Sequence, residues 1–215
     1  MTITRRELSA SAAALGLLSV LPATLASAQA PSATPSAAEL MAPGPIEDLP
    51  LGKDDAPVTI IEYASMTCPH CAHFEETTWP QLKKDYVDTG KVRYIFREFP
   101  LDPLAAAGAM LARCGGKDKF IPIIEVLFKQ QRDWVVQKPI PPLLAIAKQL
   151  GFTEESFNHC LSDQKLLDQI EAERELAASK FGVNSTPTFF INGKIYRGAV
   201  DIDEMSKAID AALKS

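Results

Sequence analysis

Two cysteines three positions apart, Cys68 and Cys71, are the residues of this chain best suited to chemistry. They follow an apolar run at 57–63 and precede a helical pattern at 73–87, which predicts a strand, a tight turn and a helix. The first backbone N–H groups of a helix have no intrahelical partner and favour a thiolate, so Cys68 is the predicted nucleophile. Cys71 would lie one helical turn further on, where it can attack a mixed disulfide on Cys68 and resolve it.

The same cysteine spacing also occurs in zinc sites. A structural zinc site takes four ligands, and its second half is usually another cysteine pair or a histidine pair. Neither follows here, and His73 is too close to Cys71 on the predicted helix for both to face one metal. The pattern therefore favours redox chemistry, with no metal and no cofactor besides the cysteine pair itself.

The segment around these cysteines resembles the active site of the DsbA-like thiol:disulfide oxidoreductases, which belong to the thioredoxin superfamily. Residues 60–74 read IIEYASMTCPHCAHF, and the dipeptide Pro69-His70 is the specific part of the likeness. A second segment, residues 182–193, reads GVNSTPTFFING and resembles the cis-proline loop of that family with the hairpin that follows it. The two motifs bracket most of the chain, and the resemblance covers roughly residues 48–215.

The resemblance implies roles for further residues. The matching X-Pro bond is cis in this superfamily, so the Thr186–Pro187 bond is expected to be cis and to bring the backbone before Pro187 beside the cysteines, where it can hydrogen-bond an extended substrate. Without the resemblance, Pro187 would read as an ordinary trans proline that opens a strand. Independently of the resemblance, His70 lies between the two cysteines, so a partly protonated imidazole there would add to the helix N-terminus in stabilising the Cys68 thiolate.

Glu62 is the charged residue in the apolar strand predicted at 58–63. One interpretation is a solvated group at the edge of a sheet, and the other is a buried acid beneath the cysteines. The resemblance favours the second, since the matching position in the family holds an acid that helps to move the proton of the buried cysteine. Burial would favour the neutral form of Glu62.

The remaining patterns predict the fold. Strands at 58–63 and 92–99 flank a helix with a kink expected at Pro80, which makes a βαβ unit with parallel strands. A strand at 188–191, a hairpin at Asn192-Gly193 and an amphipathic last helix form the closing ββα half. Helices are expected between the two halves at 103–114, 120–131 and 142–150, with a longer one broken near 161 and ending near 179. The predicted fold class is α/β: a thioredoxin fold with an inserted all-helical subdomain at about 103–180, the arrangement that the resembled family shows.

Two further cysteines, Cys114 and Cys160, lie in the predicted helical insertion. In an exported protein such leftover cysteines are more often paired than free. A bond between them would close a loop of about 45 residues and stabilise the fold by about 4 kcal/mol in the chain-entropy model. We expect a structural disulfide, with two separate buried thiols as the alternative.

The start of the chain has the composition of an export signal. Arg5 and Arg6 precede an Ala- and Leu-rich run at 8–25, and Ala-Ser-Ala follows, so residues 1–28 are predicted to be cleaved. The arginine pair fits a twin-arginine route, and a general secretory route fits as well. Both routes end outside the cytoplasm, where disulfides persist. Residues 29–47 are rich in Ala, Pro and Ser and predict a flexible spacer before the DsbA-like domain at 48–215.

Charge and family likeness limit the partners. The chain carries 22 basic and 27 acidic residues, with no basic cluster in the predicted domain, which argues against nucleic acid. The predicted function is a periplasmic oxidase, a monomer that donates its Cys68–Cys71 disulfide to newly exported cysteine-containing proteins. By resemblance, a membrane quinone-linked protein would re-oxidise it. The alternatives are a disulfide isomerase or reductase, and a thioredoxin-fold binding or chaperone module with a structural cysteine pair.

Overall fold

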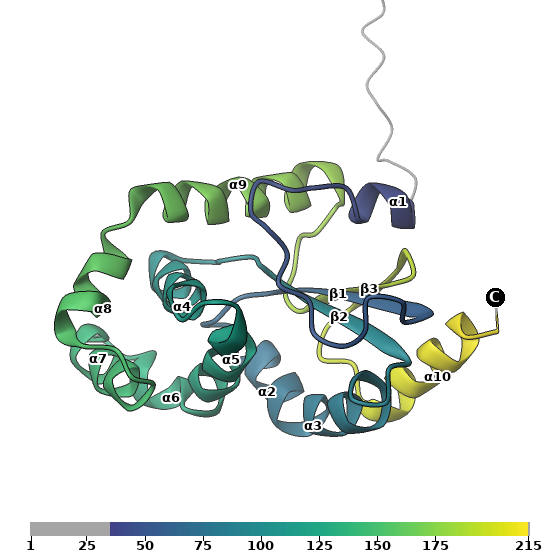
Figure 1. The fold of residues 1–215 in the computed structure, drawn as a ribbon, viewed down its shortest axis with the longest axis horizontal. Helices are drawn as coiled ribbons and strands as arrows, with labels where there is room; N and C mark the ends of the chain where they lie inside the picture. The colour runs from purple at the N-terminus through teal and green to yellow at the C-terminus, as the bar shows by residue number, and fades with distance from the viewer. Residues whose placement is uncertain (1–34, 215) are drawn as a thin grey trace, which may run out of the picture. The chain divides into compact units, whose positions relative to one another are not determined.

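The computed structural model describes residues 35–214, so the predicted signal at 1–28 lies outside the described residues (Figure 1). A four-stranded sheet in the order β2-β1-β3-β4 forms its centre. The strands are β1 Val58–Ala64, β2 Val92–Glu98, β3 Thr188–Ile191 and β4 Lys194–Arg197. Strand β1 is therefore an interior strand, and it leads directly into the cysteine pair.

The strand directions follow from the connections. Strands β1 and β2 run parallel, from Val58 opposite Val92 to Ala64 opposite Glu98, because a helical crossover joins them. Strand β3 is antiparallel to both β1 and β4. The β3–β4 hairpin turns at Asn192-Gly193, where both residues have positive φ, 44° and 89°, as a tight two-residue turn requires.

The helices between the two halves of the sheet form the predicted insertion. They are α4 Pro103–Cys114, α5 Phe120–Lys129, α6 Gln131–Trp134, α7 Ile140–Gln149, α8 Glu154–Leu161 and α9 Gln164–Lys180. Helix α10, Ile202–Ala212, closes the chain after β4. The predicted thioredoxin fold with a helical insertion is confirmed, and the helix expected at 120–131 is divided into α5 and α6 at Gln130.

Both faces of the sheet are covered. Ile60 and Phe189 lie in the larger core, toward α2 (Pro69–Thr77), α3 (Trp79–Leu82) and α10. Ile61 and Phe190 lie in a second cluster on the other face, with Leu40 of α1 (Ala37–Leu40) and Ala177 of α9. Figure 1 shows α1 and α9 on one side of the sheet and α2, α3 and α10 on the other. Burial on both faces explains why β1 and β3 are nearly continuous apolar runs.

The segment 35–47, predicted as part of a flexible spacer, packs against the sheet. It contains α1, whose first turn is closed by a capping box, and the side chain of Leu40 is 1% exposed. The prediction of a flexible spacer is wrong for these residues. The composition of the segment does not indicate that the side chains of Leu40 and Ile46 are buried against apolar surfaces of the folded domain.

A buried arginine holds this segment in place. The guanidinium of Arg97 on β2 donates to the carbonyl oxygen of Leu40 at 2.7 Å and to both carboxylate oxygens of Asp48 at 2.9 Å. It also donates to the Tyr63 hydroxyl at 2.7 Å, and Glu173 of α9 lies 3.8 Å away. The N-terminal segment, the sheet and α9 therefore share one network of buried charges.

The kink expected at Pro80 is a break between α2 and α3. Helix α2 ends at Thr77, and α3 begins at Trp79 with Pro80 in its first turn. Proline cannot continue the helical hydrogen bonding, and its ring displaces the preceding turn. The Thr78 hydroxyl donates to the carbonyl of Val200 at 3.0 Å, which ties the break to the loop before α10. A π-helical turn, η1 Lys83–Val87, then completes the crossover to β2.

Candidate active site

Cys68 and Cys71 lie where β1 turns into α2. Cys68 is the N-cap residue of α2, with an extended backbone, and Cys71 lies in the first turn. The Cys68 N–H donates to the carbonyl of Ser65 at 3.0 Å, which closes the turn between strand and helix. Cys68 is 6% exposed and Cys71 is fully buried, and both are thiols in this structure. A reaction partner can therefore approach Cys68 but not Cys71.

The surroundings of Cys68 favour a thiolate. The pKa of Cys68 is lowered to about 5, mainly by a hydrogen bond from the Cys71 thiol. Burial acts in the opposite direction, and Thr186 and the backbone N–H groups of Cys71 and His70 lower the pKa further. These N–H groups belong to the first turn of α2, which is the helix-terminus effect that the sequence predicted.

Cys71 has the opposite environment. Burial raises the pKa of the Cys71 thiol well above its usual value, and the hydrogen bond to Cys68 and the charges of Glu62 and Cys68 raise it further. At neutral pH the pair therefore consists of a Cys68 thiolate that accepts a hydrogen bond from a protonated Cys71.

Glu62 is a buried acid on β1, with 1% of its side chain exposed. Its Oε2 accepts a hydrogen bond from the Tyr94 hydroxyl, while its Oε1 has no partner among residues 35–214. Burial raises the pKa of Glu62 to about 8, opposed by the Tyr94 hydrogen bond and reinforced by the charge of Cys68. The interpretation as a solvated edge residue is wrong, because β1 is flanked by β2 and β3.

The loop before β3 brings the predicted proline to the cysteines. The Thr186–Pro187 bond is cis, and the Cys68 Sγ lies 3.4 Å from the carbonyl oxygen of Thr186. The Thr186 hydroxyl is buried and has no hydrogen-bond partner in the described part of the chain. The antiparallel pairing of β1 with β3 places Tyr63 opposite Thr188. The last residues of β1 and the first residues of β3 therefore lie side by side at the same end of the sheet.

Pro69 and His70 form the exposed start of α2. Pro69 occupies the first helical position, where its missing N–H costs no hydrogen bond. The pKa of Cys68 depends on the backbone N–H of His70. The contribution expected from the imidazole stays a prediction.

Gln131 is a site residue that the sequence placed only at the end of a predicted helix. Its side chain is 7% exposed, and its Nε2 donates to the carbonyl oxygens of Met66 at 2.9 Å and Cys68 at 3.0 Å. On the same turn, the Thr67 hydroxyl donates to Asp102, the N-cap of α4, at 2.6 Å. The helical insertion therefore holds the backbone around the nucleophile, and no sequence spacing signals these contacts.

Comparison with known proteins agrees with this site. A family model described as Thioredoxin matches residues 46–211, which include both cysteines and the cis-proline loop. The solved structure of α-DsbA1 from Wolbachia pipientis is 33% identical, with a TM-score of 0.77 over 83% of this chain and 96% of that chain. This chain belongs to the DsbA-like thiol:disulfide oxidoreductases of the thioredoxin family.

Curated relatives support the same family. A protein of Rickettsia prowazekii, whose name assigns it provisionally to the protein-disulfide oxidoreductases, is 38% identical over 168 residues, 77% of this chain and 61% of that protein. Disulfide bond formation protein D of Bacillus subtilis is 31% identical over 170 residues, 76% of each chain. The match spans 60% to 65% of the length of the five rickettsial relatives.

The second cysteine pair of this DsbA-like protein lies away from the site. A disulfide joins Cys114, at the end of α4, to Cys160 of α8, with 6.1 Å between the Cα atoms. It links two helices of the insertion across 46 positions of sequence. Through Asp102, the other end of α4 contacts the active-site turn.

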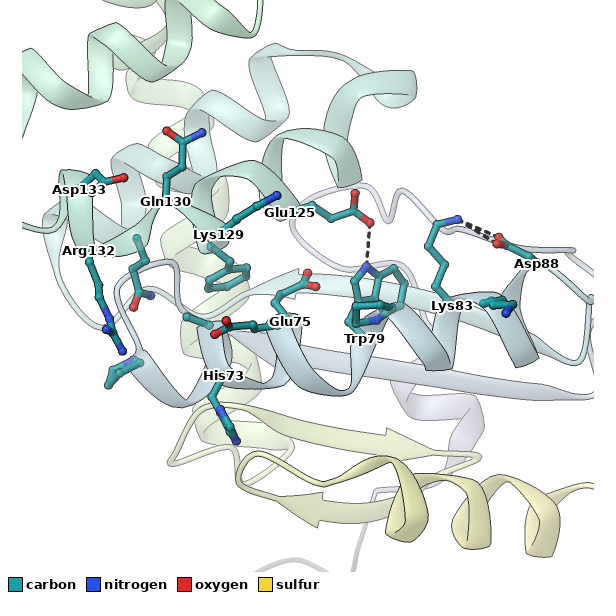
Figure 2. Close-up of a pocket in the computed structure, with 17 residues that line it drawn as sticks. His73, Glu75, Trp79, Lys83, Asp88, Glu125, Lys129, Gln130, Arg132 and Asp133 are labelled. Atoms are coloured by element: carbon teal, nitrogen blue, oxygen red, sulfur yellow. Dashed lines mark hydrogen bonds and ion pairs between the residues drawn. The ribbon is translucent and has the colours of Figure 1, made fainter.

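A pocket of about 910 Å³ lies next to the cysteine pair of the DsbA-like domain, and Pro69 and Gln131 are part of its wall. Figure 2 shows Glu75 and Trp79 on the active-site helices and Glu125 on α5, with the Trp79 Nε1 donating to Glu125 at 2.8 Å.

Within the described residues, no cluster of three His, Cys, Asp or Glu side chains is arranged to hold a metal ion. None of the helices in that part of the chain is long and apolar enough to span a membrane.

Proposed function

We propose that this DsbA-like protein is an exported oxidase that transfers its Cys68–Cys71 disulfide to newly exported cysteine-containing proteins. The supporting observation is the contrast between the two thiols, with the pKa of Cys68 lowered to about 5 and that of Cys71 raised. A stabilised Cys68 thiolate favours the reduced form of the cysteine pair over its disulfide form, so the disulfide is readily transferred to a substrate dithiol.

The transfer takes two exchange steps. A substrate thiolate attacks the Sγ of Cys68, a substrate–Cys68 disulfide forms, and the Cys68–Cys71 bond breaks with Cys71 as the leaving thiolate. Cys71 then takes a proton from Glu62. A second substrate thiolate attacks the substrate sulfur of the mixed disulfide, and Cys68 leaves as its stabilised thiolate. Two electrons pass from the substrate dithiol to the cysteine pair.

Other site residues position the partners. Pro69 and His70 are exposed beside Cys68, and the backbone before Pro187 is available to an extended substrate segment. Gln131 holds the carbonyl oxygens of Met66 and Cys68, which keeps the turn rigid while a partner is attached.

The proposed location is the periplasm, reached through a signal at residues 1–28 by the twin-arginine or the general secretory route. The composition of that segment and the Cys114–Cys160 disulfide support export. Re-oxidation of Cys68–Cys71 would fall to a membrane quinone-linked protein. The proposed active form is a monomer.

Equilibration with glutathione tests the direction of transfer. We expect a reduction potential for Cys68–Cys71 above about −180 mV, the value for protein disulfide isomerase, because the dithiol form is stabilised. A potential near about −270 mV, as in thioredoxin, would support a reductase instead. Failure to exchange with glutathione would support the binding-module alternative.

The second candidate is an isomerase. A solved structure titled protein-disulfide isomerase, from Novosphingobium aromaticivorans, is 25% identical with a TM-score of 0.68, over 77% of this chain and 97% of that chain. Ribonuclease separates the two candidates. An oxidase quickly forms disulfides in reduced ribonuclease but only slowly restores activity to ribonuclease with scrambled disulfides. An isomerase quickly restores the scrambled ribonuclease but only slowly oxidises the reduced one.

A further inference from the structure

We infer that Gln131 is a positioning residue for disulfide exchange: it fixes the backbone that aims Cys68 at the N–H groups of α2, and it thereby sets how readily the cysteine pair gives up its disulfide. The inference rests on the proposed function and extends it. It assigns control of the redox equilibrium to a residue of the helical insertion, outside both of the sequence motifs that the chain shares with its family.

One amide nitrogen holds the backbone on both sides of the Thr67–Cys68 step. Gln131 Nε2 donates to the carbonyl oxygen of Met66 at 2.9 Å and to that of Cys68 at 3.0 Å. A primary amide carries two hydrogens on this nitrogen, so each carbonyl oxygen can take one. Peptide groups are planar, so the two bonds hold the peptide group before Thr67 and the one after Cys68 in a fixed relative orientation. The backbone dihedral angles of Thr67 and Cys68 are restricted as a result.

The Gln131 side chain is itself held in place by the insertion. It is 7% exposed and lies at the start of α6. Trp134, at the other end of α6, is fully buried, and its Nε1 donates to the carbonyl oxygen of Leu127 on α5 at 2.8 Å. Gly108 of α4 lies against the same indole and against Met66, since a β-carbon built there would come within 3.1 Å of each. The amide therefore imposes its geometry on the active-site turn.

The stabilisation of the Cys68 thiolate depends on this geometry. Cys68 caps α2 with an extended backbone, φ −75° and ψ 121°, and the backbone N–H groups of His70 and Cys71 help to lower its pKa to about 5. Such hydrogen bonds weaken steeply when donor and acceptor lose their alignment. The Cys68 carbonyl oxygen that Gln131 holds also accepts the N–H of Ala72 at 3.2 Å, at the start of α2. The same oxygen therefore connects the insertion, the nucleophile and the helix.

The effect differs between the two redox forms. In the disulfide form Cys68 carries no charge, so alignment with the N–H groups contributes little to the free energy. In the reduced form the thiolate gains the full interaction. Loss of alignment therefore penalises the reduced pair selectively and makes the disulfide a weaker oxidant. A residue that only stabilised the fold would affect both forms alike.

Gln131→Met tests the inference, because methionine has a similar length and no hydrogen-bond donor. Gln130→Met is the matched control: Gln130 lines the same pocket, and its side chain forms no hydrogen bond within the described residues. Thiolate absorbance against pH gives the pKa of Cys68, and equilibration with glutathione gives the constant for disulfide transfer.

We expect Gln131→Met to raise the pKa of Cys68 by about one unit and to lower the transfer constant at pH 7 about tenfold. Gln130→Met should change the constant less than twofold. An unchanged constant in folded Gln131→Met, or equal changes in the two variants, would overturn the inference.

Nuclear magnetic resonance of the wild type gives a test that does not depend on folding of the variant. In the reduced protein, the side-chain N–H signals of Gln131 should exchange slowly with D₂O. They should also shift with a midpoint near pH 5, because one of these hydrogens is bonded to the carbonyl of the titrating Cys68. Fast exchange, or shifts that do not follow the titration, would refute the role of Gln131. A wild type that exchanges no disulfide with glutathione would refute the proposed function instead, with the Gln131 signals still measurable.

Discussion

The Sγ of Cys68 lies 3.4 Å from the carbonyl oxygen of Thr186, although 118 positions separate the two residues in the sequence. The contact exists because β1 and β3 are antiparallel neighbours, so the strand that ends before Cys68 lies beside the strand that begins after Pro187. A substrate joined to Cys68 through a mixed disulfide would therefore lie against backbone that can bind an extended chain.

Replacement of Cys71 should trap such complexes. In Cys71→Ser, Cys68 stays accessible while the thiol that resolves the mixed disulfide is missing, so long-lived adducts should accumulate. Cys68→Ser should capture nothing, because Cys71 is buried. Non-reducing gels of an exported-protein extract check this, and equal capture by both variants would show that the roles of the two cysteines are wrongly assigned.

The reduced protein should be more stable than the oxidised protein at neutral pH. Its Cys68 pKa is lowered from 9.0 to about 5, so the stabilisation is complete above pH 9 and is lost as the pH falls through 5. Linkage gives about 2–3 kcal/mol at pH 7, which exceeds the roughly 2 kcal/mol that the chain-entropy model gives for so short a disulfide loop. Urea unfolding of both forms from pH 4 to 8, with Cys114–Cys160 intact, measures the difference. A stability difference that does not shrink as the pH falls from 8 to 5 would contradict the thiolate argument.

Glu62→Gln should stabilise the protein at pH 7. The pKa of Glu62 is raised from 4.5 to about 8, so the folded protein holds a proton that the unfolded chain releases. The contribution of that proton is complete below pH 4.5 and is lost as the pH rises through 8, which leaves wild type less stable at pH 7 by about 3 kcal/mol. Gln can still accept the Tyr94 hydrogen bond. Thermal unfolding at pH 7 and pH 4 checks this, and a gain of the same size at both values would exclude titration of Glu62 as the cause.

His70→Ala should raise the pKa of Cys68 by about one unit if the imidazole assists the thiolate. The pKa should still stay below that of an ordinary thiol, because the backbone N–H groups of His70 and Cys71 remain. His73→Ala, on the exposed side of α2, is the control and should leave the pKa unchanged. Thiolate absorbance against pH measures both variants, and an unchanged value in His70→Ala would assign the whole effect of residue 70 to its backbone.

Asp48→Asn should destabilise the protein by about 2 kcal/mol, because it leaves the buried Arg97 guanidinium without a charged partner at 2.9 Å. Asp54→Asn is the matched control. Asp54 is 91% exposed and 3.6 Å from Arg93, so its loss should cost less than about 0.5 kcal/mol. Chemical denaturation compares the two variants. Equal losses would mean that the N-terminal segment is not held by the Arg97 network.

Local sequence patterns were sufficient to predict most of the architecture. The cysteine spacing, the Asn192-Gly193 turn and the strand and helix periods act over a few residues, so they can be read without knowing what packs against them. The resemblance of two short motifs added the cis geometry at Pro187 and the importance of Glu62. The family and the α/β fold followed from these signals.

Other features depend on contacts between distant parts of the chain. Arg97 reads as an outward-facing strand residue, yet it is buried because Leu40 and Asp48 fold over it. The two carbonyl oxygens held by Gln131, and the buried oxygens of Glu62 and Glu75, likewise depend on helices that meet only after folding. Burial and hydrogen bonding are properties of the assembled structure, because the energy of a polar group depends on which neighbours exclude water from it.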